Sequence, residues 1–469
     1  MVKSGLAQCG GKTLLNKLEF AGLGALLISS SAFASLSAGF DTMDYFYGSN
    51  SAGQSVFPAF EAKGDGTVSG SVFAASAQGE LTQVLLPGSD YTLPFFEFPE
   101  AWVGTSSKLG SVQVQVGRKL EHWNHLDELW GLGIWQPRFL WDELHPDQVA
   151  LTGAFLSVDR PNFHFVAMGS PINIPERGMP VDIRSGQLSS PSPWFLSPPQ
   201  QIMLFGQMTP VNYNLNVPSL QQIIFHPGLS TMARIGADEG KEGLWGSVAY
   251  AYLPMNQLFL SYNGMLGIHS NAAMDAAEVS LLPSVLYHHL VSAEAGSQWG
   301  NFNAWVSVLD EQPVPDDSMV PSGWSSQQVA PSLAVSPAVE WSPWGIRPDL
   351  PSIQIAYLEQ WGGNAPDIGP QAPSSGSFFA PRYPFQDAGQ ISIKYPYKDL
   401  MTWTKLLYDF GHDGAIFSSE IDWHVWKSWM VEAGVDLLAT GSVGTPSPND
   451  FIASYLMDDR VHGGLTYVF

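Results

Sequence analysis

The sequence predicts an all-β chain that folds as a transmembrane antiparallel up-and-down β-barrel of about 18 strands, within a range of roughly 16 to 22. Three observations predict this fold. Many segments carry apolar residues at every second position, which indicates strands with different surroundings on their two faces. Charged residues make up 13% of the chain and hydrophobic residues 45%, whereas a soluble domain usually carries about 25% charged residues. Short and long connections also alternate, as an up-and-down barrel requires.

Residues 1–34 are predicted to be a secretory signal peptide. Lys3, Lys12 and Lys17 precede an apolar run over residues 20–28, and Ala32-Phe33-Ala34 follows as a small-residue cleavage site. The apolar run is too short to span a membrane as a helix. Residues 35–469 are then expected to form one barrel.

Charge and cysteine content exclude several classes of function. The formal net charge of −23 opposes binding to nucleic acid, because phosphates would be repelled. Cys9 is the single cysteine and lies in the predicted signal peptide, so no disulfide framework or cysteine metal site is expected. No cofactor is predicted either.

The N-terminal half contains strand pairs of uneven clarity. A hairpin turned by Gln78-Gly79 is predicted, and residues 201–236 are compatible with two strands or four. From Gly243 the pattern becomes regular. The predicted pairs are 67–77 with 80–86, 100–105 with 111–118, 149–157 with 162–169, 244–253 with 257–266, 285–295 with 301–309, 332–341 with 352–361, 388–395 with 400–410, and 415–424 with 428–439.

Long connections are predicted to lie on one side of the barrel, outside the cell. The segment 170–200 is especially rich in proline and serine, a composition that is typical of a loop. The acidic group Asp310, Glu311, Asp316 and Asp317 would lie in such a loop, either binding divalent cations or simply facing solvent. The predicted extracellular loops are 119–148, 170–200, 310–331, 362–387 and 440–459.

The last nine residues, VHGGLTYVF, form a period-2 strand that ends on Phe469. Leu465, Tyr467 and Phe469 share its apolar face. This strand resembles the C-terminal strand of Gram-negative outer-membrane β-barrel proteins. The resemblance implies recognition by the barrel-assembly machinery and a place in the cell outer membrane, in contact with lipid and lipopolysaccharide. An ordinary edge strand ending in phenylalanine is the alternative.

Residues 100–123, EAWVGTSSKLGSVQVQVGRKLEHW, resemble a segment of porin-like barrels in which a strand ending in Gly-Arg follows a short turn. The resemblance implies a channel for passive passage of small solutes and no enzymatic activity. Arg118 has the parity of Val112 to Val116. It therefore either faces outward or Gly117 shifts the register.

Alternation predicts which side chains face the interior. Basic residues on a lipid face cost about 2–4 kcal/mol near mid-membrane and acidic residues somewhat less, so polar positions between apolar ones should point inward. A carboxylate patch there would favour cations; alternatively, the acids bond to Lys394, Lys405 or Arg382 in a structural network. The predicted pore-lining residues are Gln113, Gln115, Lys394, Glu420, Asp422, Glu432 and Asp436.

The connection 119–148 is rich in tryptophan, histidine and carboxylates. It is predicted to be a folded loop at the mouth, or one that folds inward and narrows the pore. The H-x-x-H spacing of two of its histidines does not specify a metal site, and none is predicted. The candidate mouth residues are His122, His125, Asp127, Glu128, Arg138 and Asp142.

Two alternatives remain beside the channel. One is a structural or adhesive surface barrel without an open pore. The other is an outer-membrane lipase, for which His145 and Asp142 are a candidate pair although no nucleophile motif accompanies them. The sequence leaves open the solute, the pore size and whether the barrel forms trimers.

Overall fold

The protein folds as a closed antiparallel barrel of 18 strands, which confirms the predicted fold class. The computed structural model describes residues 34–46, 55–86, 92–178, 180–238, 241–268, 274–314, 320–327, 329–345, 347, 350–363, 382–441 and 450–469. The predicted signal peptide lies outside these residues except for Ala34. Among the described residues, no helix is long and apolar enough to cross a membrane.

The barrel strands follow the order of the chain around the wall. They are β1 (Ala34–Tyr45), β2 (Val56–Ser69), β3 (Phe73–Leu85), β4 (Thr92–Thr105), β5 (Val112–Lys119), β8 (Leu151–Arg160), β9 (Phe163–Ser170), β15 (Gly228–Gly236), β16 (Gly243–Pro254), β19 (Tyr287–Trp299), β20 (Phe302–Val314), β22 (Ser332–Trp341), β23 (Ser352–Gly362), β24 (Asp387–Tyr397), β25 (Leu400–Asp409), β26 (Gly414–Trp426), β27 (Trp429–Thr440) and β28 (Arg460–Val468).

The last strand closes the barrel. β28 pairs with β27 on one side and with β1 on the other, where Leu465 lies opposite Phe40. Tight connections such as 161–162, 300–301, 398–399 and 427–428 lie at the same end as Phe469, which we call the turn end. Most connections at the opposite end, the loop end, are long. The predicted alternation is therefore present.

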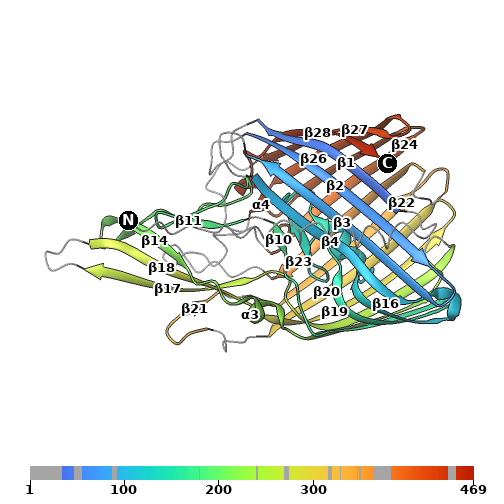
Figure 1. The fold of residues 1–469 in the computed structure, drawn as a ribbon, viewed down its shortest axis with the longest axis horizontal. Coiled ribbons are helices and arrows are strands. Elements are labelled where there is room, and N and C mark those ends of the chain that lie inside the picture. The colour runs from blue at the N-terminus through green and yellow to red at the C-terminus, as the bar shows by residue number, and fades with distance from the viewer. Residues whose placement is uncertain are drawn as a thin grey trace, which may run out of the picture.

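A second sheet extends from the loop end (Figure 1). It contains β13 (Gln201–Leu204), β14 (Gln207–Leu215), β17 (Phe259–Ile268), β18 (Met274–Ser284) and β21 (Ser325–Ser326), in the order β13-β14-β18-β17-β21. Its own small apolar core includes Val211, Tyr213 and Leu281. Figure 1 shows this sheet on the side away from the C-terminus.

The long connections contain further short elements. The segment 170–200, predicted as loop, holds β10 (Arg177–Gly178), β11 (Asp182–Arg184) and β12 (Gln187–Ser189). Two more short strands, β6 (Arg138–Leu140) and β7 (Asp147–Gln148), form a small sheet with β10. The helical elements are η1 (Ser107–Leu109), α2 (His125–Trp130), α3 (Leu220–Ile224) and α4 (Phe451–Ser454).

Two predicted hairpins are wrong. Gln78-Gly79 lies inside β3, where the pairing with β4 shifts register between Gln78 and Glu80. An isolated glycine in a strand marks a bulge as readily as a turn, and the actual turn is 70–72. The second error concerns 257–266: β16 pairs with β19, whereas β17 joins the outer sheet. Alternation indicates that a segment is a strand, but it does not identify the neighbour.

The ambiguous stretch 201–236 contains three strands, of which only β15 belongs to the barrel. Asp310 and Glu311 belong to β20 and not to a loop. Glu311 is fully buried and accepts from Arg382 at 2.5 Å, with His288 also at 2.5 Å. It is therefore not a solvated or cation-binding loop residue. Asp316 and Asp317 lie outside the described residues.

Candidate functional site: the barrel interior

The two faces of the wall differ in polarity. On β5, Val112, Val114 and Val116 are exposed on the outside, while Gln115 is buried within the barrel. On β24 the exposed residues include Ile391, Ile393, Tyr395 and Tyr397. The remaining predicted inward positions, Gln113, Lys394, Glu420, Asp422, Glu432 and Asp436, alternate with exposed or less buried apolar side chains in the same manner.

Gly117, near the loop end of β5, has a backbone conformation that favours glycine. Its φ is +136°, and a Cβ there would lie 2.2 Å from the carbonyl oxygen of Ala101. The Arg118 side chain consequently turns inward and donates to Glu97 at 2.8 Å. Arg118 therefore does not face outward, although the pairing of β5 with β4 and with β8 continues through Gly117 without a shift of register.

Residues 119–148, the inner loop, fold into the barrel. Helix α2 begins after the cap Asn124, whose side chain accepts from the Asp127 N–H, and ends at Gly131, which has a left-handed φ of 59°. Trp130 Nε1 donates to Ser336 Oγ of β22 at 2.9 Å, and Gln390 of β24 donates to the Leu129 carbonyl at 3.3 Å. The inner loop therefore crosses from β5 to the opposite wall.

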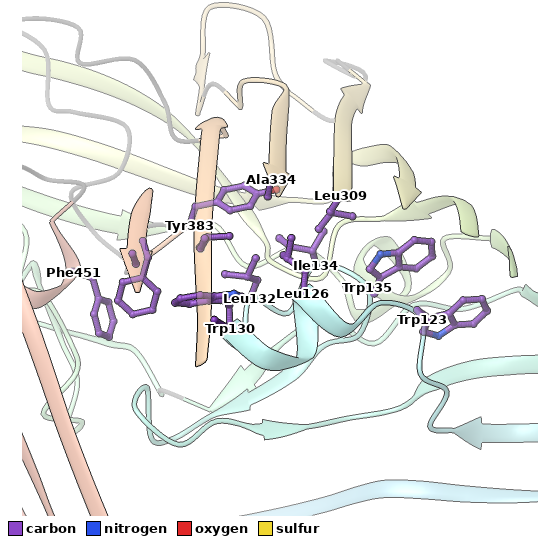
Figure 2. Packing of buried hydrophobic residues seen from close by; sticks show 14 of the residues in the cluster. Trp123, Leu126, Trp130, Leu132, Ile134, Trp135, Leu309, Ala334, Tyr383 and Phe451 are labelled. Atoms are coloured by element: carbon purple, nitrogen blue, oxygen red, sulfur yellow. The ribbon is translucent and has the colours of Figure 1, made fainter. Parts of the chain in front are cut away.

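An apolar cluster holds the inner loop in place. Trp123 and Trp135 stack with ring centroids 5.4 Å apart and planes 4° apart. In Figure 2 the loop's Leu126, Trp130 and Ile134 lie beside side chains of the barrel wall, and all belong to one buried cluster with Leu309 and Ala334. Burial of this extent makes the loop a part of the core rather than a solvated mouth segment.

Asp127 organises the turn after α2. Its carboxylate accepts from the backbone N–H groups of Ile134 at 2.8 Å and Trp135 at 3.0 Å. Burial raises the pKa of Asp127 to about 6, although these two hydrogen bonds and Arg138 act in the lowering direction. A carboxylate that satisfies two buried donors is a structural anchor.

Arg138 connects the inner loop to the neighbouring connection, and Glu143 lies in its electrostatic surroundings. Arg138 donates to Glu176 at 2.7 Å and to the Gly131 carbonyl at 2.5 Å. Burial raises the pKa of Glu143 to about 7, against the attraction of Arg138. Asn256, at the end of β16, donates to the carbonyls of Gly133 and Ile134. These contacts fix the middle of the loop.

The two histidines of the H-x-x-H spacing lie in different surroundings. His122 pairs with Glu128 at 3.0 Å, and His125 pairs with Glu294 of β19 at 3.0 Å. His125 also donates its backbone N–H to Glu294 at 2.6 Å. Each histidine therefore has its own carboxylate partner on a different element.

The end of the inner loop is tied to the last two strands. Arg460 of β28 donates to Asp142 at 2.6 Å and to Asp436 of β27 at 2.8 Å. His145 Nε2 lies 2.9 Å from Asp436 Oδ1. Burial acts to raise the pKa of Asp142, but Arg460 and His145 together hold that pKa below its ordinary value. The hydrogen-bond partner of His145 is thus Asp436, not the Asp142 of the hydrolase alternative.

The inner loop divides the interior into cavities of different charge. A cavity of about 340 Å³ between the loop and strands β1–β3 and β26–β28, the acidic cavity, carries Lys63 against seven carboxylates. These are Asp41, Glu61, Glu80, Asp142, Asp147, Glu420 and Glu432. A cavity of about 400 Å³, the basic cavity, holds Arg138, Arg382 and Lys405 against Glu128 and Glu143.

A third cavity, of about 600 Å³, lies toward the turn end. Its lining includes His122, His125 and Glu294, together with Asp159 and Arg160 at the turn end of β8. Acidic and basic side chains are nearly balanced there. The charge bias of the interior is therefore concentrated in the acidic cavity.

Among the charged residues of the acidic cavity, sequence reasoning named Asp142, Glu420 and Glu432 and missed Asp41, Glu61, Lys63, Glu80 and Asp147. The signal was present in the sequence, because Phe57, Ala59, Glu61 and Lys63 occupy every second position of β2 and therefore share one face. Glu80 was missed because the hairpin was predicted incorrectly. A turn at Gln78-Gly79 would move Glu80 away from Lys63, whereas in the structure Glu80 Oε1 lies 3.7 Å from Lys63 Nζ.

No protein-family model matches the sequence. No curated protein matches it either. Several solved structures are similar to this chain at low sequence identity. OprB of Pseudomonas putida has a TM-score of 0.42 at 8% identity, with 96% of this chain and 97% of that chain covered. OccAB1 of Acinetobacter baumannii has a TM-score of 0.46 at 10% identity, with 94% and 97% covered. A mutant of the Rh. blastica porin has a TM-score of 0.38 at 8% identity, with 93% and 100% covered.

Proposed function

We propose that this barrel lies in a bacterial outer membrane and forms a channel for passive passage of small solutes, with a preference for cations. The observation that carries the proposal is the acidic cavity, in which seven carboxylates face one lysine inside a closed wall. Charged side chains at close quarters set the sign of the ion that a pore admits.

The apolar outer surface of the barrel supports the proposal that lipid surrounds it. Exposed aliphatic side chains such as Val114, Ile391 and Leu465 cover the middle of the wall. Exposed aromatic residues lie near both ends of the strands, as they do at membrane interfaces. They include Trp299, Phe302, Trp341, Tyr395, Tyr397, Trp426 and Phe469 at the turn end, and Trp361, Tyr408 and Phe410 at the loop end.

The outer face of the terminal strand supports the proposal that the barrel is assembled in that membrane. Leu465 and Phe469 are exposed on the outer face of β28, and Tyr467 packs edge-on against Trp429 and Phe469. We therefore retain Leu465, Tyr467 and Phe469 as the proposed signal for the barrel-assembly machinery, with lipid and lipopolysaccharide as surroundings.

Single-channel recording of the purified protein in planar lipid bilayers tests the function. We expect steady current steps and, under a potassium chloride gradient, a reversal potential with the sign of cation preference. A barrel that inserts and carries no current supports the structural or adhesive alternative, and an anion-selective reversal potential contradicts the assigned role of the acidic cavity.

A further inference from the structure

We infer that His145, Asp436 and His462 form a binding site for a divalent transition-metal ion such as Zn²⁺, at the point where the inner loop meets the wall. The three residues come from the inner loop, β27 and β28. One ligand atom from each lies within 4.8 Å of the others. The inference stands independently of whether the barrel conducts.

The separations between the ligand atoms are close to those of a tetrahedral zinc site, so a small movement of the side chains would allow coordination. His145 Nε2 lies 2.9 Å from Asp436 Oδ1, and His462 Nε2 lies 3.7 Å from Asp436 Oδ2. Zinc binds imidazole nitrogen and carboxylate oxygen at about 2.0–2.2 Å, which places neighbouring ligand atoms of a tetrahedron roughly 3.3–3.5 Å apart. The first observed separation is shorter than that value and the second is longer, and they run to the two different oxygens of Asp436.

His462 has the surroundings of a metal ligand. Its Nε2 faces Asp436, while its Nδ1 lies 3.7 Å from Glu432 Oε1. Histidines that bind metals through one nitrogen are usually oriented by a carboxylate at the other. The ring also lies over Gly434, where a Cβ would be 2.3 Å from Nε2. The glycine thereby leaves room for the imidazole.

The acidic cavity provides space for a fourth ligand and negative charge close to the site. It is lined by His145, His462 and Glu432, so a fourth coordination position faces open space that a water molecule can fill. Glu420, Asp422 and Glu432 form a second group whose carboxylate oxygens lie within 4.8 Å of one another. Their negative charge attracts a cation and offsets the nearby positive charge of Arg460.

The simpler interpretation is that His145 and Asp436 only fasten the inner loop by a hydrogen bond. That role needs neither His462 nor its orientation by Glu432. Because two imidazoles and one carboxylate suit zinc-class ions better than Mg²⁺ or Ca²⁺, which prefer oxygen ligands, metal selectivity separates the two interpretations. The described residues include no cysteine, so thiols there cannot account for zinc binding.

Calorimetric titration of the folded, detergent-purified and EDTA-treated protein with zinc chloride tests the site. We expect saturable binding of about one ion per chain, unaffected by a hundredfold excess of Mg²⁺. The substitution His462→Asn leaves the His145–Asp436 and Arg460 contacts in place and should weaken zinc binding at least tenfold. Glu432→Gln should weaken it about tenfold, since loss of an orienting partner typically costs 10–100-fold.

Two variants serve as matched controls. His122→Asn removes a histidine that pairs with Glu128 elsewhere in the interior and should leave zinc affinity unchanged. Glu420→Gln removes the same charge as Glu432→Gln from the same cavity, and should cost less affinity. Absence of saturable binding in the natural protein, or equal binding by His462→Asn, overturns the inference; equal losses in the two glutamine variants overturn the orienting role of Glu432.

Discussion

The Arg460 guanidinium on the last strand donates from Nη2 to the Asp142 carboxylate of the inner loop at 2.6 Å. The same guanidinium donates from Nε to Asp436 at 2.8 Å. Arg460 and Asp436 are buried and Asp142 is partly buried, so Arg460 joins the inner loop to the seam at which the barrel closes. Removal of one member of such a buried group leaves the other charges unpaired.

Substitution Arg460→Met is expected to reduce the free energy of unfolding by about 3–5 kcal/mol, the usual cost of breaking a buried ion pair. Urea unfolding in lipid vesicles, followed by tryptophan fluorescence, measures the loss. The control is Arg184→Met, which removes an exposed pair with Asp182 and should cost about 0–1 kcal/mol. Equal losses in the two variants would contradict the assigned importance of Arg460.

The attachment of the inner loop should weaken as the pH rises. Burial raises the pKa of Asp127 from 3.8 to about 6, so the docked loop retains a proton that a released loop loses between about pH 4 and 6. Docking thus loses up to about 3 kcal/mol of stability across that window. Glu143, with a pKa raised to about 7, acts in the same direction at higher pH.

Hydrogen–deuterium exchange of α2 and the following turn, corrected for intrinsic rates, measures this dependence. We expect greater protection at pH 5 than at pH 7.5. Glu143→Gln, which cannot ionise, should reduce the difference between the two pH values. Protection that increases with pH would show that the carboxylates stabilise the docked loop in their charged form.

Charge neutralisation should shift ion selectivity in opposite directions in the two cavities. The double substitution Glu420→Gln and Asp422→Asn removes negative charge from the wall beside the acidic cavity. The reversal potential under a salt gradient should then move toward zero. Lys405→Gln removes positive charge from the basic cavity and should increase cation preference. Shifts of the same sign in both variants would refute the role of these charges.

Gly117 is expected to be intolerant of a side chain. Its φ of +136° and the 2.2 Å approach to the Ala101 carbonyl oxygen exclude a Cβ without movement of the backbone. Gly117→Ala should reduce the unfolding free energy by about 1–3 kcal/mol, the usual cost of such strain. The matched control is Gly169→Ala on β9, where a Cβ would meet no atom within 4 Å; comparable losses would contradict the argument.

The sequence by itself determined the class of fold and the polarity of the two faces. Side chains alternate strictly along a strand, so Val114 and Gln115, or Glu432 and its apolar neighbours, can be assigned to opposite faces without knowing which strands pair. The expected number of strands agrees with the 18 that the barrel contains. Closure through Leu465 opposite Phe40 follows the same pattern.

Only the tertiary structure decided which strands are neighbours and where the long connections lie. β17 has the pattern of a barrel strand but belongs to the outer sheet. The sequence could not predict this, because alternation indicates the polarity of each face of a strand and not which strand pairs with it. The inner loop enters the barrel through contacts such as Trp130 with Ser336. His145, Asp436 and His462 likewise converge only after the chain has folded, since no local pattern encodes contacts between residues so far apart in the sequence.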